Sequence, residues 1–95
     1  MSLEFEWDIT KELQNIAKHH ISFDTAKEIF FDPRVIHLTD TSHSTSEDRY
    51  FAVGKSRNGK IITVRYTWRD DCIRIIGAAE WRKWRKFYEQ NSRSK

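Results

Sequence analysis

The segment KIITVRYTWR, residues 60–69, decides the fold, because its side chains alternate between two kinds. One set is apolar (Ile62, Val64, Tyr66 and Trp68) and the other is polar (Thr63, Arg65, Thr67 and Arg69). A period of two is typical of a β-strand with one face toward a core. We therefore expect a sheet whose second face carries arginines and hydroxyl groups.

That second face has two interpretations. Guanidinium groups match phosphate oxygens in pairs, so a face with several arginines is a candidate phosphate-binding surface. The alternative is an ordinary antiparallel sheet that shows a polar face to water. Arg49 and Arg74, in neighbouring strand candidates, fit either interpretation.

Three further β-rich runs flank this segment: VIHLTD (35–40), RYFAVG (49–54) and CIRIIGA (72–78). Asn58-Gly59 predicts a two-residue hairpin, because both residues tolerate positive φ. Asp70-Asp71 predicts a second tight turn, and the polar stretch 41–48 predicts a longer loop. Connections this short favour a four-stranded antiparallel meander.

Two helices are predicted before the strands. Asp8 is a candidate N-cap for a helix that ends near His19 and has an apolar stripe of Ile9, Leu13, Ile16 and Ala17. Ser22 is the candidate N-cap of a second helix, which Asp32-Pro33 ends. Residues 4–7, EFEW, predict a short strand or an apolar anchor ahead of both.

Residues 80–90, EWRKWRKFYEQ, predict a basic amphipathic helix with Trp81, Trp84 and Tyr88 on one side. The expected fold is thus α+β: two N-terminal helices and one C-terminal helix packed on one face of the meander. At 95 residues we expect a single domain, 1–95, with 1–3 and 91–95 frayed.

The charges are distributed unevenly along the chain. Residues 1–48 carry four basic and ten acidic side chains, whereas 49–95 carry thirteen basic and four acidic ones. A one-sided basic field attracts polyanions, and an acidic half suits a basic partner; the alternative is that both are ordinary solvated surfaces. Cys72 is the single cysteine, and no run is apolar enough to span a membrane. We therefore expect a cytoplasmic protein without a membrane contact.

Lys18 and His19 fall at the predicted C-terminus of the first helix, where cations stabilise the helix dipole. They also have the chemistry for phosphodiester cleavage, since an imidazole transfers protons near neutral pH and a lysine stabilises developing phosphorane charge. RNA needs no metal for this reaction, because its own 2′-hydroxyl is the nucleophile. Residues alone leave capping and catalysis both open.

A metal site is not expected. His37, Asp40 and His43 form an HxxDxxH string, but a strand followed by a loop does not bring three such side chains together. The serines beside His43 lack the structured turn that a nucleophilic serine requires.

The succession of short motifs is more specific than any one of them. FEWD (5–8), KHxISF (18–23), FxDP (30–33), HSxxEDR (43–49), TxR (67–69), RII (74–76) and YE (88–89) follow one another across nearly the whole chain. This succession resembles the BrnT toxin family, the ribonuclease half of type II toxin–antitoxin modules in bacteria. The resemblance implies a RelE-like fold and metal-independent RNA cleavage, which inhibits translation and needs no cofactor.

The resemblance also implies the site and the partners. Its motifs give catalytic roles to Lys18, His19, Arg49 and Arg69. From the polar strand faces and the basic helix, Arg65, Arg74 and Arg82 are expected to contact the RNA. The expected protein partner is a BrnA-like antitoxin, a ribbon-helix-helix protein that binds DNA as a complex with the toxin.

The chain departs from the family pattern at two positions. His20 stands where the family has a glycine, which would be a natural residue after a helix C-terminus, so His20 must adopt a left-handed conformation or reshape the turn. Ala79 stands where an arginine is expected. These departures keep a second hypothesis open, a catalytically weak toxin-like module that binds RNA or protein.

Overall fold

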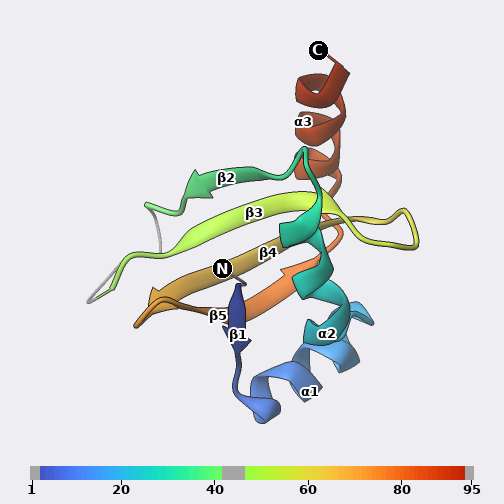
Figure 1. The fold of residues 1–95 in the computed structure, drawn as a ribbon. Helices are drawn as coiled ribbons and strands as arrows, with labels where there is room; N and C mark the ends of the chain where they lie inside the picture. Colours follow the sequence, from blue (N-terminus) through green and yellow to red (C-terminus); the bar gives the residue numbers. More distant parts are fainter. Residues whose placement is uncertain (1–2, 42–46, 94–95) are drawn as a thin grey trace.

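The computed structural model describes residues 3–41 and 47–93 and has an α+β architecture (Figure 1). Its elements are β1 (Glu4–Glu6), α1 (Ile9–His19), α2 (Phe23–Ala26), the 3-10 helix η1 (Lys27–Phe31), β2 (Ile36–Thr39), β3 (Tyr50–Lys55), β4 (Ile61–Arg69), β5 (Cys72–Ala79) and α3 (Arg82–Arg93). The predicted order of elements is confirmed, although the second predicted helix is α-helical for four residues only. No helix among these residues is long and apolar enough to cross a membrane.

The sheet has five strands in the order β1-β5-β4-β3-β2. The β2–β5 meander is antiparallel as predicted, but β1 pairs in parallel with β5, so the expected four-stranded antiparallel sheet was wrong. Two contacts attach β1. The ring of Phe5 lies 5.4 Å from that of Phe30 in the core, and Glu6 forms an ion pair of 3.2 Å with Arg74.

The two predicted turns differ from each other. Asp70 and Asp71 both have positive φ, at 50° and 66°, and join β4 to β5 as the two-residue turn that was expected. The loop at Asn58-Gly59 is longer than predicted, because the Ser56 N–H bonds to the Lys60 carbonyl (2.8 Å) and only Gly59 has a positive φ, of 89°.

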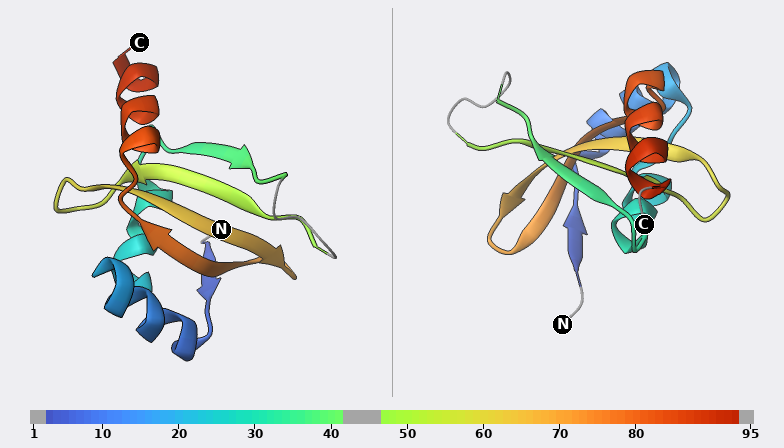
Figure 2. Two further views of the ribbon diagram at one scale, coloured as in Figure 1. Left: turned by 180° about the vertical axis from the view of Figure 1, so that it is seen from behind. Right: turned by 90° about the horizontal axis from the view of Figure 1, so that it is seen from above.

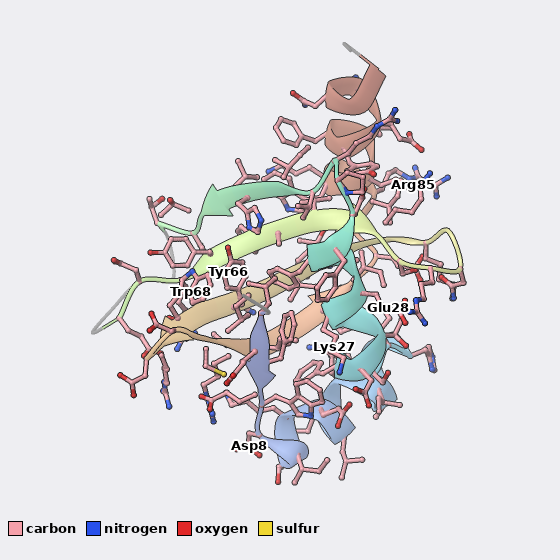
Figure 3. All side chains as sticks on the ribbon, viewed as in Figure 1. Asp8, Lys27, Glu28, Tyr66, Trp68 and Arg85 are labelled. Carbon is pink, nitrogen blue, oxygen red and sulfur yellow. The ribbon has the colours of Figure 1, made fainter. Side chains whose placement is uncertain are left out.

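The core lies between the sheet and the α2–η1 segment, which crosses the front of the sheet in Figure 1. Ile62, Val64 and Tyr66 are buried there, as the alternation predicted. Gly54 allows the close approach, since a Cβ at this position would lie 2.9 Å from the Ile29 carbonyl oxygen. The alternation was wrong for Trp68, which is 47% exposed because it lies beyond the helices at the end of β4 (Figure 3). It was also wrong for Thr63 and Thr67, which were expected on the open polar face but are buried.

The third helix does not join the other two on one face, so that expectation was wrong. Figure 2 shows α3 rising from one end of the sheet. Its Trp84 packs on Phe51, with the two ring centroids 5.6 Å apart. Phe51 is the cross-strand neighbour of Arg65, so α3 lies on the side of the sheet that carries this arginine. Tyr88 is buried and donates a hydrogen bond of 2.6 Å to Asp32 at the end of η1.

The first helix is turned the opposite way from the sequence expectation. Its apolar stripe faces solvent, with Ile9 and Leu13 each 61% exposed, whereas Glu12 and Asn15 are buried. The two oxygens of Glu12 accept hydrogen bonds from Trp7 Nε1 (3.1 Å) and from the N–H of Phe23 (3.0 Å). These bonds replace the hydration that a buried carboxylate loses and hold the polar side of α1 inward.

Candidate functional site

A shallow basic hollow of about 340 Å³ lies where α1 meets the arginine-bearing face of the sheet. We call it the basic hollow. Its lining comprises Lys11, Gln14, Asn15, Lys18, His19, Arg49, Arg65, Ile76 and Gly77. Four of these are lysines or arginines and none is acidic, so the hollow suits an anion.

The α1 side of the hollow is held by Asn15. Its Nδ2 donates to the Ile21 carbonyl (2.9 Å), and its Oδ1 accepts from the N–H of Ala78 in β5 (3.1 Å). Lys18 and His19 lie on the same helix face, three and four residues further on. One side chain thus fixes the helix that carries both residues against the strand that borders the hollow.

The helix ends at His20, which has a left-handed conformation with φ 60° and ψ 31°. Its N–H closes the last turn on the Ile16 carbonyl (2.8 Å). The left-handed alternative expected for this residue is therefore confirmed. Lys18 and His19 occupy the last turn, where the negative end of the helix dipole favours a cation.

The sheet side of the hollow contains a β-bulge. Arg65 pairs with Gly77 and the next residue, Tyr66, pairs with Ile75, so Ile76 is an extra residue on β5. A bulge bends the strand and changes the direction of nearby side chains. Ile76 and Gly77 both line the hollow next to Arg65 on the neighbouring strand.

Arg65 carries a donor for which the described part of the chain supplies no acceptor. Its Nε is buried, and it has no hydrogen-bond partner among the residues that the structure describes. A buried donor without a partner costs free energy, about 1–3 kcal/mol, so an acceptor from outside the protein would be bound favourably. A phosphate oxygen is such an acceptor.

Three of the four residues predicted as catalytic line the hollow: Lys18, His19 and Arg49. The fourth, Arg69, does not line it. Arg69 lies at the end of β4, four residues and roughly 13 Å of strand beyond Arg65, and it forms an exposed ion pair of 3.5 Å with Glu47.

The three residues predicted to contact RNA are separated. Arg65 lines the hollow, whereas Arg74 is paired with Glu6 at 3.2 Å. Arg82 lies on the outer surface of α3, in a shallow depression that also contains Glu80 and Glu89.

Sequence reasoning gave no site role to six residues at or beside the hollow: Lys11, Gln14, Asn15, Ile76, Gly77 and Trp81. Lys11, Gln14 and Asn15 form a polar stripe with Lys18 at helical spacing, and that stripe was a readable signal. Trp81 touches His19, with ring centroids 6.4 Å apart and an angle of 82° between the planes. Nothing local in the sequence links Trp81 to His19, because the two residues meet only through the fold.

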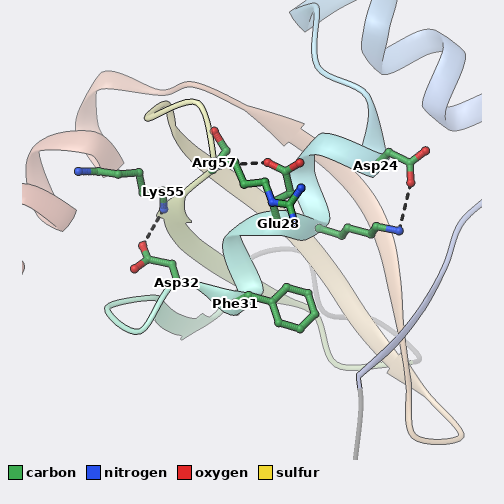
Figure 4. A pocket seen from close by; sticks show the side chains of 8 residues that line it. Asp24, Glu28, Phe31, Asp32, Lys55 and Arg57 are labelled. Carbon is green, nitrogen blue, oxygen red and sulfur yellow. Dashed lines mark hydrogen bonds and ion pairs between the residues drawn. The ribbon is translucent and has the colours of Figure 1, made fainter.

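A second hollow of about 360 Å³ lies between η1 and the β3–β4 loop (Figure 4). Its carboxylates are engaged within the protein. Glu28 accepts the N–H of Arg57 (3.0 Å), Asp32 accepts that of Lys55 (2.7 Å), and Asp24 pairs with Lys27 (3.2 Å). This hollow therefore has the chemistry of a structural junction.

The HxxDxxH string shows no convergence in the described part of the chain, where no three His, Cys, Asp or Glu side chains could hold a metal. His43 and the neighbouring serines lie outside the described residues. His37 Nδ1 instead lies 2.8 Å from the Tyr66 hydroxyl. Burial lowers the pKa of His37, and burial together with the nearby Tyr50 raises the pKa of Tyr66 to about 12.

Comparison with known proteins points to one family. Residues 7–85 match the model of a family described as "Ribonuclease toxin, BrnT, of type II toxin-antitoxin system". Among solved structures, the chain resembles the Brucella abortus ribonuclease toxin BrnT, with a TM-score of 0.64, 22% identity, and coverage of 84% of this chain and 97% of that one. At this identity the likeness shows a shared fold. Comparison with curated protein sequences gives no match.

Proposed function

Because the chain belongs to the BrnT family of ribonuclease toxins from type II toxin–antitoxin systems, we propose that it cleaves RNA at the basic hollow. One observation carries the proposal. Lys18 and His19 from α1, Arg49 just before β3 and Arg65 from β4 surround the same hollow. Capping alone would explain two of these residues and would not require the arginines.

The proposed reaction is an internal transesterification. The 2′-oxygen of a ribose bonds to the adjacent phosphorus and loses its proton, while the bond to the 5′-oxygen breaks and that oxygen gains a proton. The products are a 2′,3′-cyclic phosphate and a 5′-hydroxyl end. The nucleophile belongs to the RNA, so the reaction needs a proton carrier and positive charge around the phosphorane.

His19 is the proposed proton carrier, because it is the only histidine of the hollow and is half-buried. Lys18, Arg49 and Arg65 are proposed to stabilise the phosphorane. Arg65, predicted from the sequence only as an RNA contact, takes the phosphate-stabilising position in this proposal because of its unsatisfied Nε. Arg69 is proposed to contact the RNA backbone beyond the hollow, which requires its exposed pair with Glu47 to open.

A type II toxin has a protein antitoxin. We propose that this antitoxin is a BrnA-like ribbon-helix-helix protein, that it covers the face bearing Arg65 and Arg69, and that the complex binds operator DNA. The same resemblance supports a RelE-like mode of action on translation, in the cytoplasm. Co-elution of the two proteins and loss of RNA binding in the complex are the expected observations.

The structure favours one alternative at a specific position. Ala79, which replaces the family's arginine, is 2% exposed beside Thr63, so no cation stands there. A toxin-like module that binds RNA and cleaves it weakly is therefore the second candidate.

Incubation of the purified chain with single-stranded RNA in EDTA tests the proposal. We expect cleavage that leaves cyclic-phosphate ends and stops when the ribose carries a 2′-O-methyl group. Binding without cleavage would leave the second candidate, and neither binding nor cleavage would refute both.

A further inference from the structure

Trp81 differs from the other aromatic residues near α3 in how it is used. Trp84 packs on Phe51, and Tyr88 is buried and bonded to Asp32. Trp81 keeps 38% of its surface exposed. Within the described part of the chain, the aromatic ring that Trp81 meets is the imidazole of His19.

The position of Trp81 is fixed by the start of α3. Its carbonyl oxygen accepts a hydrogen bond from the N–H of Arg85 (3.0 Å), which closes the first turn of the helix. The indole is therefore an exposed aromatic surface held at the rim of the basic hollow, next to the proposed proton carrier. With 38% of its surface exposed, the indole leaves part of its face open to a ligand.

The surroundings of Trp81 select the kind of ligand. Aromatic faces next to a cationic groove are the means by which proteins hold single-stranded nucleic acids, because each base offers a flat face and each phosphate a negative charge. The hollow beside His19 supplies the cations Lys18 and Arg65. A base that is paired in a duplex is already stacked and cannot lie on the indole.

We propose that Trp81 is the stacking surface for an unpaired nucleobase next to the cleaved phosphodiester, and hence that the substrate of the hollow is single-stranded RNA. The stacking of the base does not depend on the proposed ribonuclease function; only the cleavage of the neighbouring phosphodiester rests on it. Trp81 is a positioning residue: the stacked base holds the neighbouring ribose and phosphate against His19 and Arg65.

Binding of a short, fluorescein-labelled 2′-O-methyl RNA, which cannot be cleaved, tests the subsite by anisotropy. Trp81→Ala should raise the Kd by roughly 5- to 150-fold, the usual effect of losing one stacked base, and Trp81→Phe should raise it less. Trp68→Ala is the matched control, since Trp68 is also exposed but lies at the end of the molecule opposite Arg85 and α3 (Figure 3). It should leave the Kd unchanged.

An abasic scan of the same oligonucleotide provides a readout that a purely structural role would not alter. At one position of the oligonucleotide, removal of the base should raise the Kd for the wild-type protein. The same removal should not raise the Kd for the Trp81→Ala protein any further. If every abasic position affects both proteins equally, or if Trp81→Ala binds as tightly as the wild type, the subsite is refuted. If Trp81→Ala fails to fold, the scan on the wild type still tests the subsite. A wild type that is insensitive to the loss of any single base would refute it.

The outcomes separate this inference from the ribonuclease proposal. Binding that depends on Trp81 without cleavage of unmodified RNA would keep the subsite and remove the enzyme. Cleavage of unmodified RNA together with binding that does not depend on Trp81 would keep the enzyme and remove the subsite. A Trp81→Ala protein that binds RNA normally but loses the antitoxin would assign the indole to a protein interface and overturn the inference.

Discussion

Asn15 in α1 and Ala78 in β5 are joined by a hydrogen bond of 3.1 Å, across 63 residues of sequence. The same side chain donates to the Ile21 carbonyl (2.9 Å), so one amide ties the helix to the sheet and to the segment that follows it. Lys18 and His19 approach Arg65 because this helix is held against this strand.

Asn15→Ala should therefore destabilise the protein by about 2 kcal/mol or more, because it leaves two buried backbone groups without partners. RNA cleavage should fall as well, since the helix is no longer fixed beside β5. Urea denaturation measures the first effect and single-turnover cleavage the second. Asn15→Asp separates the two bonds, because it keeps an acceptor for Ala78 and loses the donor to Ile21. The exposed neighbour Gln14→Ala should change stability by less than about 0.5 kcal/mol.

The orientation of α1 gives a prediction opposite to the one its apolar stripe suggests. Leu13→Ala should cost less than about 0.5 kcal/mol, because Leu13 is 61% exposed. Glu12→Ala should cost about 1–3 kcal/mol, because Trp7 and Phe23 each lose an acceptor. Ile29→Ala, at 0% exposure, provides the reference for a true core deletion of about 2–5 kcal/mol. A core-sized loss for Leu13→Ala would mean that the stripe is buried in solution.

The contrast between β4 and α1 shows how far sequence reasoning reaches. Alternation in residues 60–69 correctly placed Ile62, Val64 and Tyr66 in the core, because a period of two leaves only the choice of which set is buried. It was wrong for Trp68, which is exposed, and for Thr63 and Thr67, which are buried. In α1 the assumption that the apolar residues face the core failed, because the apolar stripe of this helix faces solvent. The bonds of Glu12 and Asn15 to distant backbone groups decided the outcome, and no local pattern encodes them.

The site was predictable to the extent that it is local. Lys18 and His19 were found from a motif at a helix end, and their meeting with Arg49 follows from the fold. The choice of Arg65 over Arg69 as a lining residue was not predictable, because it depends on where α1 meets β4 and β5 in the fold.

Stability should fall at alkaline pH because of Tyr66. Burial raises its pKa to about 12, so the folded state binds the phenolic proton more tightly than the unfolded chain does. This contribution is complete below the unfolded pKa near 10, and it is lost as the pH rises through 12, on the order of 2 kcal/mol in all. Denaturant titrations between these pH values measure it. Tyr66→Phe should remove the slope, even though its lost contact with His37 lowers the starting stability; an unchanged slope would assign the effect to another group.

His20→Gly should stabilise the protein by up to about 1 kcal/mol, because glycine adopts the left-handed conformation of this residue without the Cβ penalty. RNA cleavage should stay intact or rise, since the His20 side chain does not line the hollow. Thermal melts and cleavage assays on the same preparation are sufficient. A large loss of cleavage with unchanged stability would show that the imidazole itself takes part.

The catalytic set is tested by alanine substitution of Lys18, His19 and Arg49. Each change should cut cleavage by roughly 10²–10⁴-fold, which is typical for the loss of an acid–base or charge-stabilising group. Stability should change little for Lys18 and His19, because a cation at a helix end contributes only about 0.3–1 kcal/mol. Full activity of His19→Ala, or inactivity explained wholly by unfolding in a thermal melt, would return both helix residues to a capping role.

Arg65 and Arg69 complete this test as a matched pair, because they are the same residue type on the same face of the same strand. Arg65→Ala should cost as much cleavage as the substitutions above, since Arg65 lines the hollow beside Lys18 and Arg49. Arg69→Ala should cost roughly tenfold or less, the effect of an exposed phosphate contact, because Arg69 is half-exposed and paired with Glu47. Raising the salt concentration should reduce the Arg69 effect and leave most of the Arg65 effect, since exposed charges are screened more strongly than buried ones. The reverse ranking would place the reacting phosphate at the end of β4 and return the catalytic role to Arg69.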